Sequence, residues 1–212
     1  MKKKLKEIKR NCKLYGRKGA LIYYGLGQIK KFLHIEIKRS VFYVCDLDKV
    51  LQKPDVEFRK LNFADFEKEA HFPEVRKQGW YTPTKIEIIR KRFEKNRAEA
   101  YGHFDGENLS SSGWIEYDIK NIGERQLNGR NAFLFDDYTD PRFRGRGYQS
   151  AIIAFRLYHV QKAGYDFAWS NVYDYNRQSR RNYLKAGFHP TVELLTVKFK
   201  NGKTKQYFKN LL

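Results

Sequence analysis

The chain has 212 residues, of which 41% are apolar, 16% aromatic and 32% charged, and its formal net charge is +19. This aromatic content argues against a disordered chain, and no run of 18 uncharged apolar residues could span a membrane. The first residues lack the apolar block of a signal peptide, and Cys12 and Cys45 are too few for a disulfide framework or a metal site. We therefore expect a cytoplasmic protein with reduced thiols and no metal ion.

The positive charge is concentrated at the start of the chain. Residues 1–44 carry 13 Lys and Arg against Glu7 and Glu36, a net of +11, whereas the other 168 residues carry 30 against 22, a net of +8. A potential of this sign attracts polyanions: nucleic acid, anionic lipid, or a phosphorylated cofactor or substrate.

Residues 1–55 are predicted to form a basic N-terminal extension. Apolar side chains recur there at steps of three and four among lysines and arginines: Leu5, Ile8, Cys12 and Tyr15. This spacing predicts a basic amphipathic helix over residues 2–15. A second apolar stripe over 22–33, a short buried strand over 41–45 and a polar linker over 46–54 follow. The extension either docks on anionic lipid or packs on the rest of the chain with a solvated lysine face.

Residues 56–212 have the pattern of a mixed α/β domain of the α+β type. The expected elements, in chain order, are a strand over 56–61, an ambiguous helix over 63–79, a helix opened by Thr82-Pro83-Thr84, strands near 98–104 and 112–118, a strand over 132–138, a helix over 149–163, a strand over 166–172, a helix over 177–185, and a hairpin of 191–200 and 203–208 that turns at Asn201-Gly202.

A glycine-bearing turn joins the strand over 132–138 to the helix that follows. It reads Asp140-Pro141-Arg142-Phe143-Arg144-Gly145-Arg146-Gly147-Tyr148-Gln149. Backbone N–H groups at such a turn, with the helix dipole behind them, bind phosphate, and arginines add charge-assisted bonds. A solvated basic turn is the alternative. The spacing matches neither the dinucleotide-binding fingerprint nor the P-loop.

A second motif runs from Asn176 to Phe188 with the pattern Asn-x-x-Ser-x-x-x-Tyr-x-Lys-x-Gly-Phe. In this order, the two motifs together resemble the GNAT superfamily of acyl-CoA-dependent N-acyltransferases (Gcn5-related N-acetyltransferases). The resemblance covers roughly residues 56–208 and is strongest over 132–188.

This resemblance implies a GNAT fold, with a mixed, mostly antiparallel central sheet splayed open between the strands over 132–138 and 166–172. Acyl-CoA, with acetyl-CoA as the expected donor, would lie in that cleft. The pantetheine would hydrogen-bond to the main chain of Asp137, Tyr138 and Thr139, and Asn176 and Ser179 would also contact the cofactor. The pyrophosphate would rest on one loop: Arg142, Phe143, Arg144, Gly145, Arg146, Gly147 and Tyr148.

The resemblance gives Tyr183 a hydrogen bond, or a proton, to donate to the leaving sulfur. A phenol near pKa 10 giving its proton to a thiolate whose acid is near 8.5 is uphill by roughly 2 kcal/mol, so we expect a hydrogen bond rather than full transfer. A core tyrosine on an amphipathic helix is the alternative.

The general base is harder to assign. Many members of the family carry a glutamate five residues before the motif asparagine, but this chain has Asn171 there, and an amide cannot act as a base. We favour Asp136, because a carboxylate within a largely apolar strand is costly without a use. Glu116 or a chain of water molecules could serve instead. His103 and His189 are isolated and are expected to be structural.

The function expected from the resemblance is transfer of an acetyl group to an amine of a small molecule or amino sugar, by direct attack on the thioester. Two alternatives stay open: a basic nucleic-acid-binding protein, and a catalytically silent ligand-binding module of the same fold. Peripheral contact with the inner face of an anionic membrane also stays open. Neither the acceptor, the acyl chain length nor the oligomeric state follows from the sequence.

Overall fold

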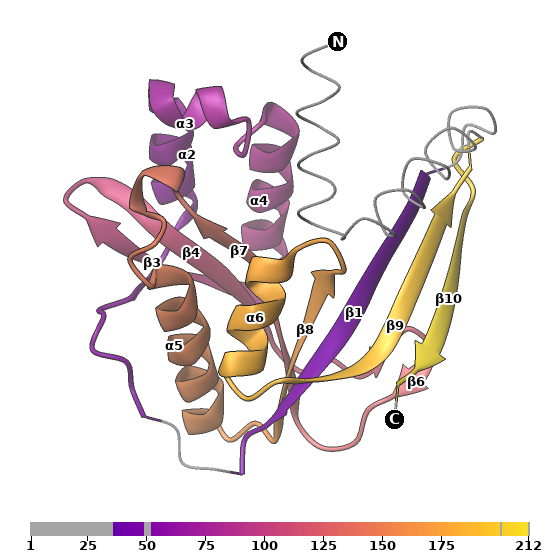
Figure 1. The fold of residues 1–212 in the computed structure, drawn as a ribbon. Helices are drawn as coiled ribbons and strands as arrows, with labels where there is room; N and C mark the ends of the chain where they lie inside the picture. The colour runs from indigo at the N-terminus through magenta and orange to yellow at the C-terminus, as the bar shows by residue number, and fades with distance from the viewer. Residues whose placement is uncertain (1–35, 49–51, 200, 212) are drawn as a thin grey trace. The chain divides into compact units, whose positions relative to one another are not determined.

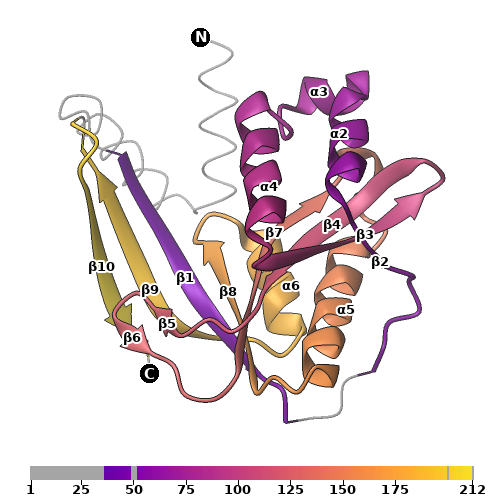
Figure 2. The same ribbon diagram turned by 180° about the vertical axis from the view of Figure 1, so that it is seen from behind.

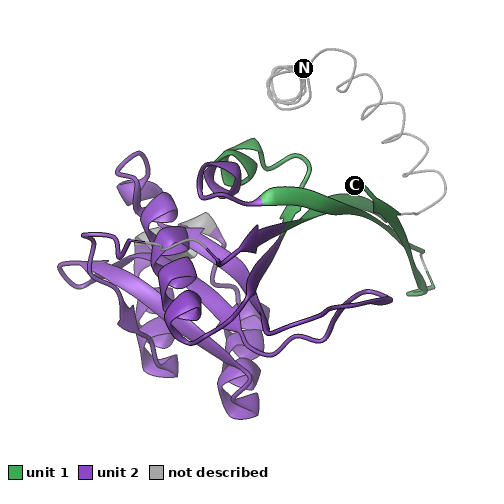
Figure 3. Ribbon diagram, turned by 90° about the horizontal axis from the view of Figure 1, so that it is seen from below, with its two compact units in different colours: residues 1–43, 171–181, 189–212 green, residues 44–170, 182–188 purple. Residues whose placement is uncertain are grey.

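The structure, a computed structural model, describes residues 36–48, 52–199 and 201–211. The helices predicted over 2–15 and 22–33 lie outside these residues. The chain divides into two compact units, coloured separately in Figure 3. The larger unit comprises residues 44–170 and 182–188, and the smaller unit comprises residues 171–181, 189–212 and those up to Tyr43.

The larger unit is a mixed, mostly antiparallel sheet with helices on it (Figures 1 and 2). Its strands follow the order β8-β7-β4-β3-β2, and only β7 and β8 run parallel. The strands are β2 (Arg59–Lys60), β3 (Ala98–Asp105), β4 (Asn108–Glu116), β7 (Asn131–Thr139) and β8 (Phe167–Tyr173), of which β8 belongs to this unit up to Ser170. The helices are α2 (Phe63–His71), α3 (Pro73–Gln78), α4 (Pro83–Lys95), the short η1 (Pro141–Phe143), α5 (Tyr148–Lys162) and α6 (Arg177–Lys185), of which the last crosses into this unit from the smaller one.

An aromatic core joins α2 and α4 to the sheet. The Trp114 ring of β4 is buried, stacks on Phe66 of α2 with 5.5 Å between centroids, and lies 5.2 Å from Phe93 of α4. Rings of this size bury most of the apolar area that holds such a small domain together.

Helix α5 buries a stripe of apolar side chains against β3, β4 and β7: Ile152, Ile153, Leu157 and Val160. The helix ends where the sequence predicts it to end. Gly164 follows it with a φ of 76°, a left-handed conformation that favours glycine at this position.

The smaller unit holds three strands in the order β10-β9-β1, with bounds β1 (Glu36–Asp46), β9 (His189–Lys198) and β10 (Thr204–Asn210). The predicted C-terminal hairpin is confirmed, with Gly202 at a φ of 79° in its turn. Arg39 of β1 pairs with Glu193 of β9 at 2.6 Å. Strand β1 runs well beyond the predicted residues 41–45, whereas the division of the chain at residue 55 stays a prediction.

The structure differs from the predicted elements at two places. The strand predicted over 56–61 shrinks to Arg59–Lys60, because Phe58 and Leu61, three residues apart, are the side chains that turn inward. A small hairpin, β5 (Asn121–Ile122) and β6 (Arg125–Gln126), was not predicted. The ambiguous region 63–79 resolves into two helices, α2 and α3. None of the helices in the described ranges is long and apolar enough to cross a membrane.

The start of α4 gives a stability prediction. Thr82 caps the helix, because its hydroxyl oxygen accepts the Lys85 N–H at 3.2 Å, and Pro83 follows. We expect Thr82→Ala to lower the free energy of unfolding by about 1 kcal/mol, measured by urea denaturation. Thr82→Ser keeps the accepting oxygen and should lose far less, so equal losses in the two variants would contradict the cap.

Candidate active site

The loop between β7 and α5 exposes backbone in front of a helix. Gly145 and Gly147 have φ values of 84° and 82°, and an added Cβ would meet no atom within 4 Å at either position. The carboxylate of buried Asp140 accepts the Arg142 N–H at 2.8 Å and thereby shapes the turn that precedes the glycines. The glycines therefore leave the main chain open to a ligand at the positive end of the α5 dipole.

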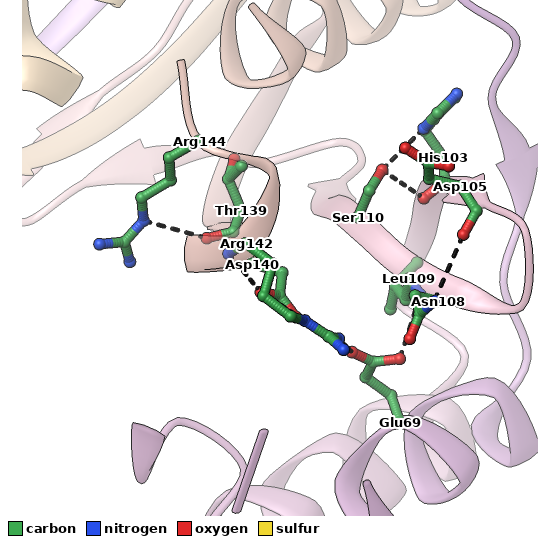
Figure 4. A network of polar contacts seen from close by, with 10 residues as sticks. All are labelled: Glu69, His103, Asp105, Asn108, Leu109, Ser110, Thr139, Asp140, Arg142 and Arg144. Atoms are coloured by element: carbon green, nitrogen blue, oxygen red, sulfur yellow. Dashed lines mark hydrogen bonds and ion pairs between the residues drawn. The ribbon is translucent and has the colours of Figure 1, made fainter. Parts of the chain in front are cut away.

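Arg142 lies between two buried carboxylates, those of Asp140 and Glu69 (Figure 4). Its guanidinium donates to Asp140 at 2.6 Å and lies 3.8 Å from Glu69 of α2. The other oxygen of Glu69 accepts the Leu109 N–H at 3.0 Å, and burial raises the pKa of Glu69 above its ordinary value. Arg142 therefore anchors the loop to α2, and phosphate binding by its guanidinium stays a prediction.

The other predicted loop residues divide between packing and exposure. The Phe143 side chain is buried, whereas Arg144 and Arg146 are exposed. Arg144 donates to the Thr139 carbonyl at 3.4 Å, and Arg146 pairs with Asp105 at 2.8 Å. Two exposed arginines thus border the glycines.

Tyr148, at the first turn of α5, stacks on the His103 ring with 4.5 Å between centroids. The other side of His103 is also occupied, since its Nδ1 lies 2.7 Å from the Ser110 hydroxyl. These contacts agree with the structural role expected for His103.

Strand β7 loses its parallel neighbour halfway along. Its pairing with β8 ends at Leu134 and Ser170, whereas on the β4 side it continues to Thr139. From Phe135 to Thr139, β7 is therefore paired with β4 on one side but is beyond its ladder with β8 on the other. This is the stretch for which the sequence predicts main-chain bonds to pantetheine.

Asp136, the predicted base, turns into a cluster of cations. Its backbone has a φ of 56° beside a register shift between β4 and β7. The same oxygen, Oδ2, accepts from Lys85 and Arg92 of α4. Burial raises the pKa of Asp136, but the two cations outweigh burial and hold that pKa below its ordinary value. A carboxylate held this way is a weak base at neutral pH, and a catalytic role for Asp136 stays a prediction.

Asp137, the next residue, belongs to a buried chain of polar side chains. Its Oδ1 accepts from Arg156 of α5 at 2.5 Å, and its Oδ2 accepts from the Tyr183 hydroxyl of α6 at 2.8 Å. Tyr183 is 2% exposed and Arg156 is 0% exposed. The two neighbouring aspartates of β7 thus face different elements, α4 for Asp136 and α5 with α6 for Asp137.

The Arg156 guanidinium also binds three carbonyls around the same part of the sheet. It donates to Ile152 at 3.2 Å, to Trp114 at 2.9 Å and to Phe135 at 3.4 Å. Gly113 makes the room, because a Cβ there would lie 2.6 Å from the Arg156 Cζ. Sequence reasoning missed Arg156, although Ile152, Arg156 and Val160 follow one another at steps of four, so that the arginine interrupts an apolar stripe.

The motif residues of the smaller unit lie at the start of α6. The Asn176 side chain accepts the Ser179 N–H at 3.2 Å and so caps the helix. The Asn171 Nδ2 is buried and finds no hydrogen-bond partner among the residues described. Cofactor contacts by Asn176 and Ser179 stay predictions.

The fit of Arg156 against Gly113 gives a second stability prediction. Gly113→Ala places a methyl group against the guanidinium and should lower the free energy of unfolding by about 1–3 kcal/mol. Gly106→Ala is the control: its φ is 61° with open space around it, so only backbone strain of about 1 kcal/mol is expected. A Gly113→Ala variant as stable as the parent protein in urea would contradict the placement of Arg156.

Comparisons with known proteins agree on the fold. A GNAT-family protein from Novosphingobium aromaticivorans superposes on this chain with a TM-score of 0.55 at 16% identity, over 76% of this chain and 63% of its own. A Drosophila protein gives 0.55 at 14% identity, over 84% and 58%, and a GNAT-family acetyltransferase from Colwellia psychrerythraea gives 0.51 at 14%, over 78% and 56%.

The chain thus spans about three fifths of the length of these structures. No curated protein matches it. The sequence model of the acetyltransferase (GNAT) family matches residues 58–188, which is more than half of the chain. The matched residues include β7 and the glycine loop that follows it. The chain therefore belongs to the GNAT acetyltransferase family.

Proposed function

We propose that the protein is an acyl-CoA-dependent acyltransferase that moves an acetyl group from acetyl-CoA to an amine of a small molecule or amino sugar. The observation that carries this proposal is the open backbone at Gly145 and Gly147, placed before a helix of 15 residues. A pyrophosphate there would meet N–H groups, the positive end of the helix dipole and the guanidinium groups of Arg144 and Arg146.

The strand that leads into this loop supports the same function. Beyond Leu134, β7 stays paired with β4 but no longer with β8, so an extended chain could add to it there as a further strand would. A ligand that places its phosphates on the loop and its arm along this edge has the shape of acyl-CoA. Its thioester would then lie beside β7 near Asp137.

The proposed chemistry is direct attack. The amine nitrogen forms a bond to the thioester carbon, and a backbone N–H stabilises the oxyanion that results. The C–S bond then breaks with its electron pair leaving on sulfur, the nitrogen gives its extra proton to water, and the sulfur takes up a proton from water. Tyr183 takes part through its hydroxyl, and the sequence predicts that it donates to the sulfur. In the structure the only proton of that hydroxyl is donated to Asp137, so a bond to sulfur requires the hydroxyl to turn.

Calorimetry and turnover separate this function from its alternatives. Acetyl-CoA should bind to the protein, with its phosphates contributing to the affinity. A nucleic-acid-binding protein should instead bind duplex DNA in preference to acetyl-CoA, and its affinity for DNA should fall steeply from the lower to the higher of two salt concentrations. Thiol release that requires an added amine would then distinguish an enzyme from a silent ligand-binding module. Binding of DNA but not of acetyl-CoA would contradict the proposal.

Gly145 tests the phosphate site. Gly145→Val places a branched side chain over the exposed backbone, and we expect the dissociation constant of acetyl-CoA to rise at least tenfold, about 1.4 kcal/mol. Gly202→Val is the matched control, because Gly202 has a similar φ of 79° and open surroundings but lies in the β9–β10 turn. A folded Gly145→Val variant that binds acetyl-CoA as before would contradict the assignment of the loop.

Tyr183 tests the participation of its hydroxyl. Tyr183→Phe should lower kcat while leaving the affinity for acetyl-CoA nearly intact, because the hydroxyl acts as charge develops during transfer. Steady-state thiol release and calorimetry on the same preparation measure the two quantities. No change in kcat, or equal losses in kcat and affinity, would show that Tyr183 is a packing residue.

A further inference from the structure

The side of β7 that meets α4 carries two positive charges against one negative charge. Lys85 and Arg92 of α4 both donate to Oδ2 of Asp136. Burial raises the pKa of Asp136, but the two cations outweigh burial and hold that pKa below its ordinary value, so the carboxylate is ionised at neutral pH. In the part of the chain that the structure describes, no other acid pairs with either cation.

The excess positive charge is largely removed from water. The side chains of Lys85 and Arg92 are 21% and 25% exposed. A charge with so little solvent around it is costly unless an opposite charge accompanies it. The cluster of Lys85, Arg92 and Asp136 therefore favours binding of one further anion, and its remaining exposure leaves that anion a way in.

Arg92 has donors to spare for such an anion. A guanidinium carries five N–H donors in a planar fork, and the bond to Asp136 uses only Nη1. Its Cζ lies 5.1 Å from the centroid of the Trp114 ring and 4.9 Å from that of Phe135, so aromatic rings hold the guanidinium in place. A guanidinium fixed in this way suits the oxygens of a carboxylate or a phosphate.

Lys85 stands where a helix does not favour a lysine. It lies in the first turn of α4, which contains no acidic residue, and the positive end of the helix dipole disfavours a cation there. A residue that breaks a local rule in this way is expected at a functional site. An anion bound beside Lys85 would offset the repulsion.

An exposed tryptophan borders the two cations. Trp80, which precedes α4, stacks on the buried Tyr138 ring with 5.4 Å between centroids. The Lys85 Nζ lies 5.5 Å from the centroid of the Trp80 ring. A large ring held at the surface next to a charged group offers a flat apolar wall to a small ligand.

These groups lie next to the stretch of β7 that we assign to the acyl donor. Asp136 meets α4 and Tyr138 meets Trp80, and Asp137, near which the thioester would lie, stands between them in the strand. An anion bound by α4 beside Asp136 would therefore be only a few bonds away from an amine that attacks the thioester.

We propose that Lys85 and Arg92 bind an acid group of the acceptor, with Trp80 as a wall beside it. This inference rests on the proposed function and names its acceptor class: an amine that carries a carboxylate or a phosphate a few bonds from the nitrogen, as in an amino acid or an amino-sugar phosphate. The bound acid brings the charge of the cluster to zero. Asp136, for which the sequence predicts a base, acts here as a positioning residue that aligns the two cations.

Matched acceptors test whether the acid group is required. Thiol release is measured with α-amino acids and their amides, and with glucosamine 6-phosphate and glucosamine, so that the members of each pair differ only in the acid group. We expect kcat/KM to be at least tenfold higher for the acid member of the pairs that turn over, and the pairs that respond distinguish a carboxylate from a phosphate. Equal or higher values for the neutral members would overturn the inference.

Variants of α4 test the two cations. Lys85→Gln and Arg92→Gln should each raise the KM of the best acid acceptor at least tenfold, while the dissociation constant of acetyl-CoA, measured by calorimetry, changes less than twofold. Lys91→Gln and Arg90→Gln, the same changes at exposed positions of this helix, are the matched controls and should leave both quantities unchanged. An unchanged KM in the two test variants would contradict the assignment.

A charge reversal separates recognition from a loss of stability. Lys85→Glu should reduce the ratio of kcat/KM for the acid acceptor to that for its neutral partner at least a hundredfold, whereas a damaged fold would lower both values together and leave the ratio as it was. Lys85→Arg keeps the charge and should keep the preference for the acid. If Arg92→Gln does not fold, the Lys85 variants carry the test, and a ratio that does not respond to Lys85→Glu would overturn the inference.

These outcomes separate the two proposals. A wild-type protein that binds no acetyl-CoA, or releases no thiol with any amine, refutes the proposed function. A wild-type enzyme that acetylates neutral amines as well as their acid partners refutes only the inference about the acceptor.

Discussion

The buried ion pair between Arg156 and Asp137 is the interaction on which the larger unit depends. It joins α5 to β4 and β7 through the carbonyls of Trp114 and Phe135, and it extends to α6 through Tyr183. Removing one partner of such a pair leaves a buried charge uncompensated, which costs about 3–5 kcal/mol. Gly113 of β4 lacks a side chain where the guanidinium lies, so β4 also accommodates the ion pair.

This pair is one of several ion pairs that hold β7 beyond the point where its pairing with β8 ends. Beyond Leu134 the strand keeps its ladder with β4. The Asp136 side chain is bound by cations of α4, and the Asp137 side chain is bound by Arg156 of α5. Farther on, Asp140 and Glu69 hold Arg142 and with it the start of the loop. A ligand that binds main-chain groups benefits when those groups are already fixed.

Local patterns in the sequence predicted much of this fold. Helix α6 has the predicted bounds, and α5 ends just before Gly164 as expected, because helix periodicity and a terminal glycine are properties of neighbouring residues. The partners of Arg156 could not be predicted, since Trp114 lies 42 residues away and Asp137 lies 19 away. The strand over 56–61 failed for a related reason: which of its side chains turn inward depends on distant partners such as Ala100, whose carbonyl accepts the Leu61 N–H.

The candidate site divides in the same way. The glycines of the loop and the family motifs were visible in the sequence, since they depend on spacing alone. The competition of Lys85 and Arg92 for Asp136, and the commitment of the Tyr183 proton to Asp137, depend on how separate elements meet.

A crystal structure of the protein with acetyl-CoA at high resolution tests the central claim most directly, namely that the glycine loop and the part of β7 beyond its pairing with β8 bind an acyl donor. The account predicts the pyrophosphate on the N–H groups around Gly145 and Gly147 and the pantetheine along Phe135 to Thr139. A pyrophosphate bound elsewhere, or a pantetheine that does not follow this part of β7, would contradict it.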